Sequence, residues 1–329
     1  MAPRVLIGIL AHARPAALTE TLRSVRALDY PNVVTFLVQS GMTDFEFESI
    51  AQANPWVSSF PNSRNLGAAG GRNYIIELAR GQSDYILFLD SDALLARDSV
   101  TRLVQVYEEL ERPGLVGCLV RVTERPCEIH SAGVSFDPDT FREIHHVAPL
   151  TFFFRQRDAV IATAVMGRNE TLQVAPRLDE KIFAYREDID WCLQLQHAGY
   201  KNYVIRDAVA YHSLERPRFH PAIIYYLARN QWFVARKLGA AWTHPAMRGF
   251  VWSMYGELFR RLRVGTPLAL NCIVAGTIGW LHAWMNRGGI APGWMRRTPD
   301  QFLEQRFHNL LFQSRFSGLA KRVLGRSSL

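Results

Sequence analysis

The first 110 residues alternate between short, continuous apolar runs and longer stretches whose apolar side chains recur at helical spacing. Residues 5–10 (VLIGIL) and 33–38 (VVTFLV) have the composition of buried strands, and residues 18–28 between them have an apolar side chain at every third or fourth position. We expect further strands at 57–60 and 85–89 and further helices at 70–80 and 100–110. This order predicts βαβ units and a parallel sheet, which would bind ligands at the carboxyl ends of its strands.

From residue 115 the pattern is less regular, with turn residues at 136–139. An apolar stretch at 159–166 leads into a loop, and Gly199 is placed to end a helix. We expect strands at 115–122, 151–154, 203–205 and 208–211, and helices at 187–198, 221–238, 245–262 and from 301 onward. The middle of the chain therefore predicts a second half of the sheet, followed by a helical extension.

Length and charge divide the chain further. At 329 residues it exceeds the roughly 250–300 at which a single core stops growing. Its 48% hydrophobic and 21% charged residues exclude a mainly disordered protein. Residues 1–215 hold 21 Lys and Arg against 27 Asp and Glu, a net charge of −6, so the remaining residues carry +14 of the total of +8. We expect two halves of one domain at 1–110 and 111–215, and a basic helical extension at 216–329.

The cysteines and the first residues bear on the compartment. Four cysteines show no spacing typical of a zinc site or a disulfide framework, and we expect buried thiols in a reducing compartment: Cys118, Cys127, Cys192 and Cys272. The first ten residues lack the charged and apolar regions of a secretory signal. The sequence therefore predicts a cytoplasmic location.

One uncharged segment, residues 264–286, is long enough to span a bilayer. It contains proline, asparagine, histidine and three glycines, which make a poor spanning helix. A helix at the membrane interface ranks first, a helix buried in the protein second and a spanning helix last.

The sharpest chemical signal is Asp90-Ser91-Asp92, which directly follows the expected strand at 85–89. Two carboxylates two residues apart can turn toward one ligand, and carboxylate oxygens suit Mg²⁺ or Mn²⁺. The alternative is a solvated turn or a cap for the helix that follows.

Further stretches occur in a fixed order along the chain. They are NLGAAGGRN at 65–73, FAYREDID at 183–190, AGY at 198–200 with AVAYH at 208–212, and the segment 225–232. Together with the DxD tripeptide, this set resembles the glycosyltransferase family 2 enzymes, and in particular their bacterial rhamnosyltransferase-like branch, over residues 4 to 235. The resemblance implies an α/β fold of the GT-A type, a Rossmann-like mixed sheet flanked by helices, here with a C-terminal helical extension.

The resemblance implies roles for three residues of a metal site. Asp92 would contact the metal, Asp90 would contact the ribose and lie at the metal, and His212 would be the third metal-associated residue. An imidazole beside a carboxylate suits Mn²⁺, and Mg²⁺ is the other candidate. The alternative for His212 is a histidine at a strand end with its hydrogen bonds satisfied.

It also implies an acceptor side. Asp188 matches the general base that would take a proton from an acceptor hydroxyl. Glu187 would position that base or bind the acceptor, while Tyr185, Trp191 and Asp190 would line an acceptor pocket. The alternative is that the three acids only cap the first turn of a helix.

Donor contacts are expected from Asp90, Ser91, Asn65, Gly67 and Arg72. Glycine would let the backbone approach a diphosphate, and arginine would supply countercharge. The neutral Gln39 stands where family members carry an aspartate that reads the nucleobase, so uridine is not assumed.

The resemblance implies an inverting, metal-dependent hexosyl- or deoxyhexosyltransferase that moves a sugar from a nucleotide-diphosphate-sugar to a hydroxyl acceptor. The alternatives are a sugar nucleotidyltransferase and a non-catalytic membrane-associated scaffold. For the basic extension we expect an anionic membrane surface or a lipid-linked acceptor, at the inner face of the cell membrane, and no nucleic acid. An ordinary helical appendage packed on the body or on a second subunit is the other interpretation.

Overall fold

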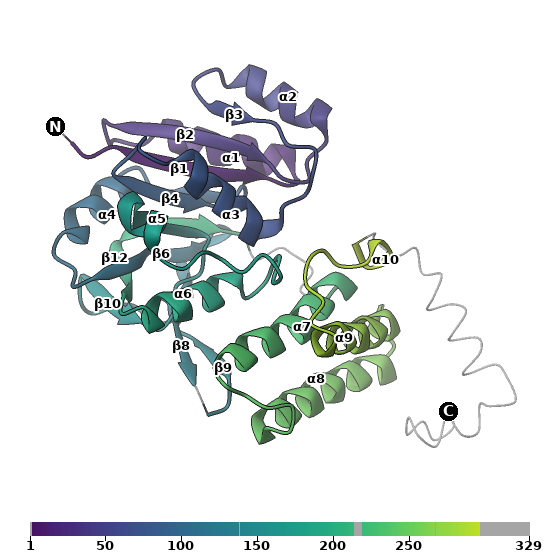
Figure 1. The fold of residues 1–329 in the computed structure, drawn as a ribbon. Coiled ribbons are helices and arrows are strands. Elements are labelled where there is room, and N and C mark those ends of the chain that lie inside the picture. The colour runs from purple at the N-terminus through teal and green to yellow at the C-terminus, as the bar shows by residue number, and fades with distance from the viewer. Residues whose placement is uncertain (1, 138, 214–218, 267, 297–329) are drawn as a thin grey trace, which may run out of the picture. The chain divides into compact units, whose positions relative to one another are not determined.

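The computed structural model describes residues 2–296 except 138, 214–218 and 267 (Figure 1). Its contacts divide the chain into two compact units. The first comprises Met1–Asp137 and Arg142–Arg216, and the second comprises Pro138–Phe141 and Pro217–Leu329. The mixed α/β architecture and the helical extension that the sequence predicts are confirmed. The expected helix from 301 onward lies outside the described residues, and the division at residue 110 stays a prediction.

The first unit is a sheet with helices on its faces. Its strands are β1 (Val5–Ala11), β2 (Val33–Gln39), β3 (Ser58–Phe60), β4 (Tyr85–Leu89), β5 (Ala93–Leu95), β6 (Pro113–Val122), β7 (Arg125–Ser131), β8 (Val134–Asp137), β9 (Arg142–His145), β10 (Phe154–Arg157), β11 (Ala164–Arg168) and β12 (Lys201–His212). Its helices are α1 (Pro15–Arg26), α2 (Asp44–Ala53), α3 (Gly67–Leu78), α4 (Ser99–Tyr107), α5 (Asn169–Val174) and α6 (Glu187–His197).

The strand order of the main sheet is β10-β12-β6-β11-β4-β1-β2-β3, with β5 paired to β12 and β7 to β6. The strands β3, β2, β1 and β4 are parallel, as the βαβ pattern predicts. β11 is antiparallel to both β4 and β6, and β12 is parallel to β6. It follows that β4, β6 and β12 run in one direction and end at the same edge of the sheet.

Buried apolar residues explain why these segments pair. All five side chains of β4 are buried, as are six of the seven in β1, which is what strands covered on both faces require. Gly8 allows a close approach in β1, because a Cβ there would lie 2.5 Å from the side chain of Ile75 on α3. The opening strands therefore follow directly from the apolar runs in the sequence.

Several expected boundaries are wrong. The strand expected at 151–154 is β10 at Phe154–Arg157, so the two share one residue. The two strands expected at 203–205 and 208–211 are the single strand β12, which contains an irregularity between Ile205 and Val209. Helix α2 was not expected, although Thr43 and Glu46 form a capping box at its start. Cys127 is exposed, while the other three cysteines are buried as expected.

The second unit is helical, with α7 (Pro221–Lys237), α8 (Pro245–Arg263), α9 (Ala269–Trp284) and α10 (Gly293–Arg296). Helix α9 packs closely on α7, because a Cβ at Gly279 would lie 2.6 Å from the backbone oxygen of Tyr225. Most of the uncharged segment 264–286 is this helix, which starts at Ala269. Within the described part of the chain, no helix combines the length and apolarity that crossing a membrane requires.

Candidate active site

The sheet brings two distant parts of the sequence together at one edge. Asp90 and Asp92 follow β4, and His212 is the last residue of β12. The short strand β5 folds back onto β12 and places Ala93 in register with His212. Asp92 therefore lies beside His212, although His212 is 120 positions further along the chain. This edge is where a parallel sheet presents side chains to ligands.

The three predicted metal-site residues form one cluster. Their ligand atoms all lie within 4.8 Å of one another, and among the described residues they are the group of acids, histidines and cysteines that could hold a metal ion. His212 Nε2 is 3.5 Å from Asp92 Oδ1. The side chains of Asp92 and His212 are 8% and 13% exposed.

The chemistry of the cluster fits a divalent cation. Burial lowers the pKa of His212, and the nearby Asp90 opposes that shift only in part, so the imidazole tends to stay neutral and keep a lone pair. Two carboxylates with one neutral imidazole form a donor set suited to Mn²⁺ or Mg²⁺. Asp92 also has Arg14 Nη1 3.7 Å from its Oδ2, so the acid already has a partial counter-ion. The cluster can therefore hold a metal through Asp90, Asp92 and His212.

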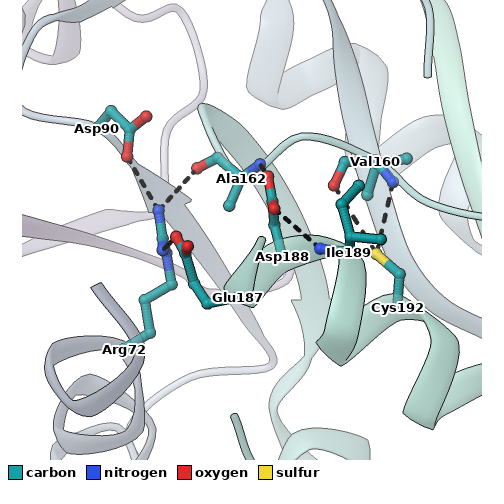
Figure 2. Close-up of polar contacts among 8 residues, drawn as sticks. All are labelled: Arg72, Asp90, Val160, Ala162, Glu187, Asp188, Ile189 and Cys192. Carbon is teal, nitrogen blue, oxygen red and sulfur yellow. Dashed lines mark hydrogen bonds and ion pairs between the residues drawn. The ribbon is translucent and has the colours of Figure 1, made fainter. Parts of the chain in front are cut away.

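Arg72 connects this cluster to Glu187, the neighbour of the predicted general base Asp188 (Figure 2). Its guanidinium donates to Asp90 Oδ1 at 2.9 Å and to Glu187 Oε1 at 2.8 Å. It also donates to the carbonyl oxygen of Ala162 at 3.2 Å. Because Arg72 is buried and holds two acids from α6 and the β4 edge, it does not present a free charge to a diphosphate. The expected donor contact of Arg72 is thus replaced by a bridging position between the two sides of the site.

Asp188 lies in the first turn of α6, where two backbone amides fix its carboxylate. Ala162 N donates to Oδ2 at 3.1 Å, and Ile189 N donates to Oδ1 at 2.8 Å (Figure 2). The backbone of Ala162 thus donates to Asp188 through its N–H and accepts from Arg72 through its carbonyl oxygen. Two fixed hydrogen bonds orient the carboxylate, as a general base requires.

The loop before α6 has an unusual backbone. Phe183, Tyr185 and Arg186 have φ values of 66°, 64° and 70°, in the left-handed region that non-glycine residues seldom adopt. Such conformations cost on the order of 1–3 kcal/mol each and persist where the surroundings hold them. Arg186 is held by an ion pair with Glu143 of β9. This strained loop sets the direction in which Glu187 and Asp188 enter the site.

The first two acids of α6, Glu187 and Asp188, have raised pKa values. Burial raises the pKa of Glu187 to about 7, the negative charge of Asp188 adds to the shift, and Arg72 opposes it. Burial also raises the pKa of Asp188, while the amide of Ala162 and the charge of Arg72 lower it. Raised pKa values in a pair of neighbouring acids are typical of proton-transfer sites.

Gln39 does not have a free amide for a nucleobase. Its Nε2 donates to Met42 O at 3.0 Å and to Asp44 Oδ1 at 2.7 Å, and its Oε1 accepts from Asn62 N at 2.8 Å. The residue is 2% exposed. Gln39 therefore ties together the loops that follow β2 and β3, and its nucleobase contact stays a prediction.

The start of α3 is also filled by protein. Phe183 O accepts hydrogen bonds from Ala68 N at 2.7 Å and Ala69 N at 3.2 Å, so these amides do not face a phosphate. Gly67 has a φ of 69°, and a Cβ there would lie 2.5 Å from Phe183 O. The glycine thus permits a close approach of the 183–186 loop instead of a diphosphate. Asn65 Oδ1 accepts from Gly67 N at 2.9 Å, which gives Asn65 a turn-forming role.

The expected acceptor-side residues separate into buried and exposed ones. Trp191 is 0% exposed, donates to Pro176 O at 2.9 Å and packs edge-to-face on Phe88, so its side chain is part of the core. Asp190 is 2% exposed and accepts from Gln194 at 2.6 Å, which makes it structural too. Tyr185 is 40% exposed, so of these three side chains it is the one that is open to solvent. Ser91, between the two aspartates, is partly buried.

Replacing Trp191 with alanine should lower the free energy of unfolding by about 3–5 kcal/mol, because a fully buried ring and its hydrogen bond are lost. Urea denaturation measures this. Tyr185→Ala is the matched control, since its ring is exposed, and its stability should stay close to that of the wild type. Equal stability of the two variants would contradict the core placement of Trp191.

Three contributors to the site were not expected from the sequence. Ala162 acts through its backbone N–H and carbonyl oxygen, which no side-chain pattern signals. Arg14 has a left-handed φ of 61° just before α1, and Glu143 comes from a hairpin whose strands were not expected. The position of Arg14 after the first strand was the available signal, because loops at strand ends line ligand sites.

Comparison with known proteins agrees with this geometry. Residues 6–210 match the family described as glycosyl transferase family 2. The chain belongs to this family. Among curated relatives it is 24% identical over 191 residues to the dTDP-rhamnosyl transferase RfbF of Shigella flexneri, covering 53% of this chain and 61% of that protein. It is 34% identical over 103 residues to an uncharacterized glycosyltransferase of Haemophilus influenzae, covering 30% of this chain and 40% of the relative. The chain thus spans less than two thirds of either relative.

Solved structures share the fold. GalNAc-T7, crystallised with UDP, GalNAc and Mn²⁺, superposes with a TM-score of 0.57 at 14% identity, covering 94% of this chain and 57% of that one. The mannosyltransferase PcManGT of Pyrobaculum calidifontis, in complex with GDP-Man and Mn²⁺, gives 0.52 at 15% identity, covering 99% and 85%. At this level of sequence identity the likeness shows the fold alone, which is the GT-A fold.

Proposed function

We propose that this glycosyltransferase family 2 protein is an inverting, metal-dependent hexosyl- or deoxyhexosyltransferase that moves a sugar from a nucleotide-diphosphate-sugar to an acceptor hydroxyl. The observation that carries the proposal is that Arg72 pairs both with Asp90 of the metal-binding cluster and with Glu187, the residue next to the fixed carboxylate of Asp188. The solved relatives with nucleotides and Mn²⁺ support the same class of donor.

On the donor side, Asp90, Asp92 and His212 would hold Mg²⁺ or Mn²⁺. The bound ion would offset the negative charge that grows on the departing diphosphate. Arg14, half exposed beside Asp92, is the cation at this edge that is placed to meet a phosphate oxygen. The buried guanidinium of Arg72 fixes the carboxylate of Asp90 through an ion pair.

On the acceptor side, Asp188 would accept the proton of the acceptor hydroxyl while the oxygen attacks the anomeric carbon opposite the diphosphate. Attack from the side opposite the diphosphate is a single displacement, so it inverts the anomeric configuration. It requires one carboxylate base. Glu187 binds Arg72 and so positions Asp188 instead of contacting the acceptor. The exposed ring of Tyr185 can pack on the acceptor sugar.

The acceptor that we propose is a glycan or a lipid-linked sugar, within polysaccharide biosynthesis, and the proposed place of action is the inner face of the cell membrane. The supports are the likeness to a rhamnosyl transferase and the excess of basic residues in the second unit. The donor class is tested by thermal-shift titration with UDP, GDP, dTDP and CDP in the presence of Mn²⁺. One nucleotide should raise the melting temperature in a metal-dependent way, and the absence of any shift would count against a nucleotide-sugar transferase.

The pH dependence of transfer should reflect the buried acids. Because the pKa of Asp188 is raised, kcat/KM should rise with pH along a limb that lies above the ordinary range of an aspartate. Arg72 lowers the pKa of both acids, so Arg72→Met should move this limb to higher pH, by about one unit or more. A pH profile of kcat/KM measures the limb.

Two further variants serve as controls for that profile. Arg72→Lys keeps the charge without the fork geometry, and its limb should stay nearer to that of the wild type. Arg80→Met removes an exposed arginine just beyond the same helix and should leave the limb unchanged. A folded Arg72→Met protein with the wild-type limb would contradict the proposed effect of Arg72 on the acids.

A further inference from the structure

The outward face of helix α9 is apolar, which is the reverse of the usual arrangement on a surface helix. Apart from Asn271, the buried residues of this helix are small, namely Ala269, Cys272, Ala275, Gly276, Gly279 and Ala283. The exposed stripe carries larger apolar side chains at helical spacing, with Val274, Leu281 and Trp284 exposed by 41%, 50% and 67%. A surface helix in water normally directs such side chains inward. This face of α9 is therefore built to meet an apolar medium.

Helix α8 continues the same surface. Trp252 is 78% exposed and Phe259, seven residues later, is 43% exposed, so both lie on one face of the helix. Between them, the Tyr255 hydroxyl lies 2.8 Å from that of Thr277 on α9, which joins the two stripes. α8 and α9 run side by side in the second unit (Figure 1). We call the exposed side chains the α8–α9 patch: Trp252, Phe259, Val274, Leu281 and Trp284.

Arginines mark the ends of the patch. Arg248 lies four residues before Trp252, and Arg263 lies four residues after Phe259. Both arginines are exposed and continue the same face of α8. Arg287 is exposed just after the end of α9. Over residues 219–296 the sequence has nine Lys and Arg and one acidic residue, Glu257, a net charge of +8. An apolar centre with a cationic border is complementary to the surface of an anionic bilayer.

We infer that the α8–α9 patch binds the surface of an anionic membrane, with its two tryptophans at the level of the lipid headgroups. Tryptophan favours that level because its ring is apolar and its N–H is polar. A second copy of the chain fits less well, because it would bring another strongly basic unit against the first and the like charges would repel. The inference deepens the membrane location proposed above, on which it rests, by naming the surface that makes the contact, and its test does not depend on transferase activity.

The test is sedimentation of the full chain with vesicles of phosphatidylcholine alone or of phosphatidylcholine mixed with phosphatidylglycerol. At low salt the wild type should sediment with the mixed vesicles and should stay in the supernatant with the neutral ones. The double variant Trp252→Ser, Trp284→Ser should bind the mixed vesicles at least about tenfold more weakly, because two large apolar side chains are lost from the contact. Arg248→Gln with Arg263→Gln should also weaken binding, on the order of tenfold.

The matched control is Phe45→Ser, which removes an apolar side chain that is 84% exposed on the first unit. It should bind like the wild type, and all variants should keep the wild-type circular dichroism spectrum and melting temperature. Wild-type binding by the tryptophan variant would overturn the inference, as would equal binding of the wild type to neutral vesicles. A vesicle-free dimer that the tryptophan variant dissociates would also overturn it and assign the patch to a second copy.

Discussion

Replacing Asp188 with asparagine is expected to lower kcat by about 10²–10⁴-fold, the range that a general base contributes. Asparagine keeps the size of the side chain and one oxygen for the amides of Ala162 or Ile189, but it cannot take a proton at neutral pH. Donor affinity should stay near that of the wild type, because Asp188 lies on the acceptor side. Single-turnover transfer and nucleotide titration measure the two quantities separately.

Asp190→Asn is the matched control for this variant. Asp190 lies two positions further along α6, is buried and accepts a hydrogen bond from Gln194. Its replacement should lower the melting temperature while kcat stays close to that of the wild type. If Asp188→Asn retains nearly full transfer, or if Asp190→Asn loses as much kcat while folded, then Asp188 is not the base.

Replacing Asp92 with alanine should remove the metal dependence of the protein together with its activity. Asp92 is the acid nearest to His212 and is almost wholly buried, so its loss leaves Asp90 and His212 as an incomplete donor set. Mutation of a residue that only hydrogen-bonds to a metal ligand typically lowers metal affinity by roughly 10–100-fold. Loss of a ligand itself should lower the affinity at least as much. Titration of Mn²⁺ by electron paramagnetic resonance, with and without nucleotide, gives the affinity directly.

Asp98→Ala tests whether the effect belongs to the cluster. Asp98 is six residues further along, pairs with Arg102 and takes no part in the cluster. It should bind Mn²⁺ as the wild type does. An Asp92→Ala protein that binds Mn²⁺ with wild-type affinity would show that the metal, if one is used, is held elsewhere.

The sequence predicts the first half of the fold well, because buried parallel strands such as β1, β2 and β4 are continuous apolar runs. The hairpin of β8 and β9 was not expected, since exposed polar side chains such as those of Arg142 and His145 give it little apolar periodicity. Strand β12 was divided into two because Arg206 and Asp207 interrupt its apolar pattern, although the chain continues through them as one irregular strand.

For the site, sequence motifs locate residues better than they assign their contacts. Asp90, Asp92 and His212 come together as expected, because they end strands that run in the same direction. Trp191 directly follows the matching stretch 183–190, and Gln39 stands where the sequence departs from the family, but both are buried in hydrogen-bonded structure. A motif does not distinguish a side chain that faces a ligand from one that supports its neighbours. That distinction depends on packing between segments that are distant in the chain, as with Gly67 and Phe183.

The most direct measurement is product analysis with the nucleotide-sugar whose nucleotide gives the largest thermal shift. With Mn²⁺ and an acceptor, we predict release of the nucleoside diphosphate, loss of that release on chelation of the metal, and a new glycosidic bond of inverted anomeric configuration, all readable by NMR. Formation of pyrophosphate from a sugar phosphate and a nucleoside triphosphate would contradict this and identify a nucleotidyltransferase instead. Retention of the anomeric configuration would contradict the single displacement assigned to Asp188.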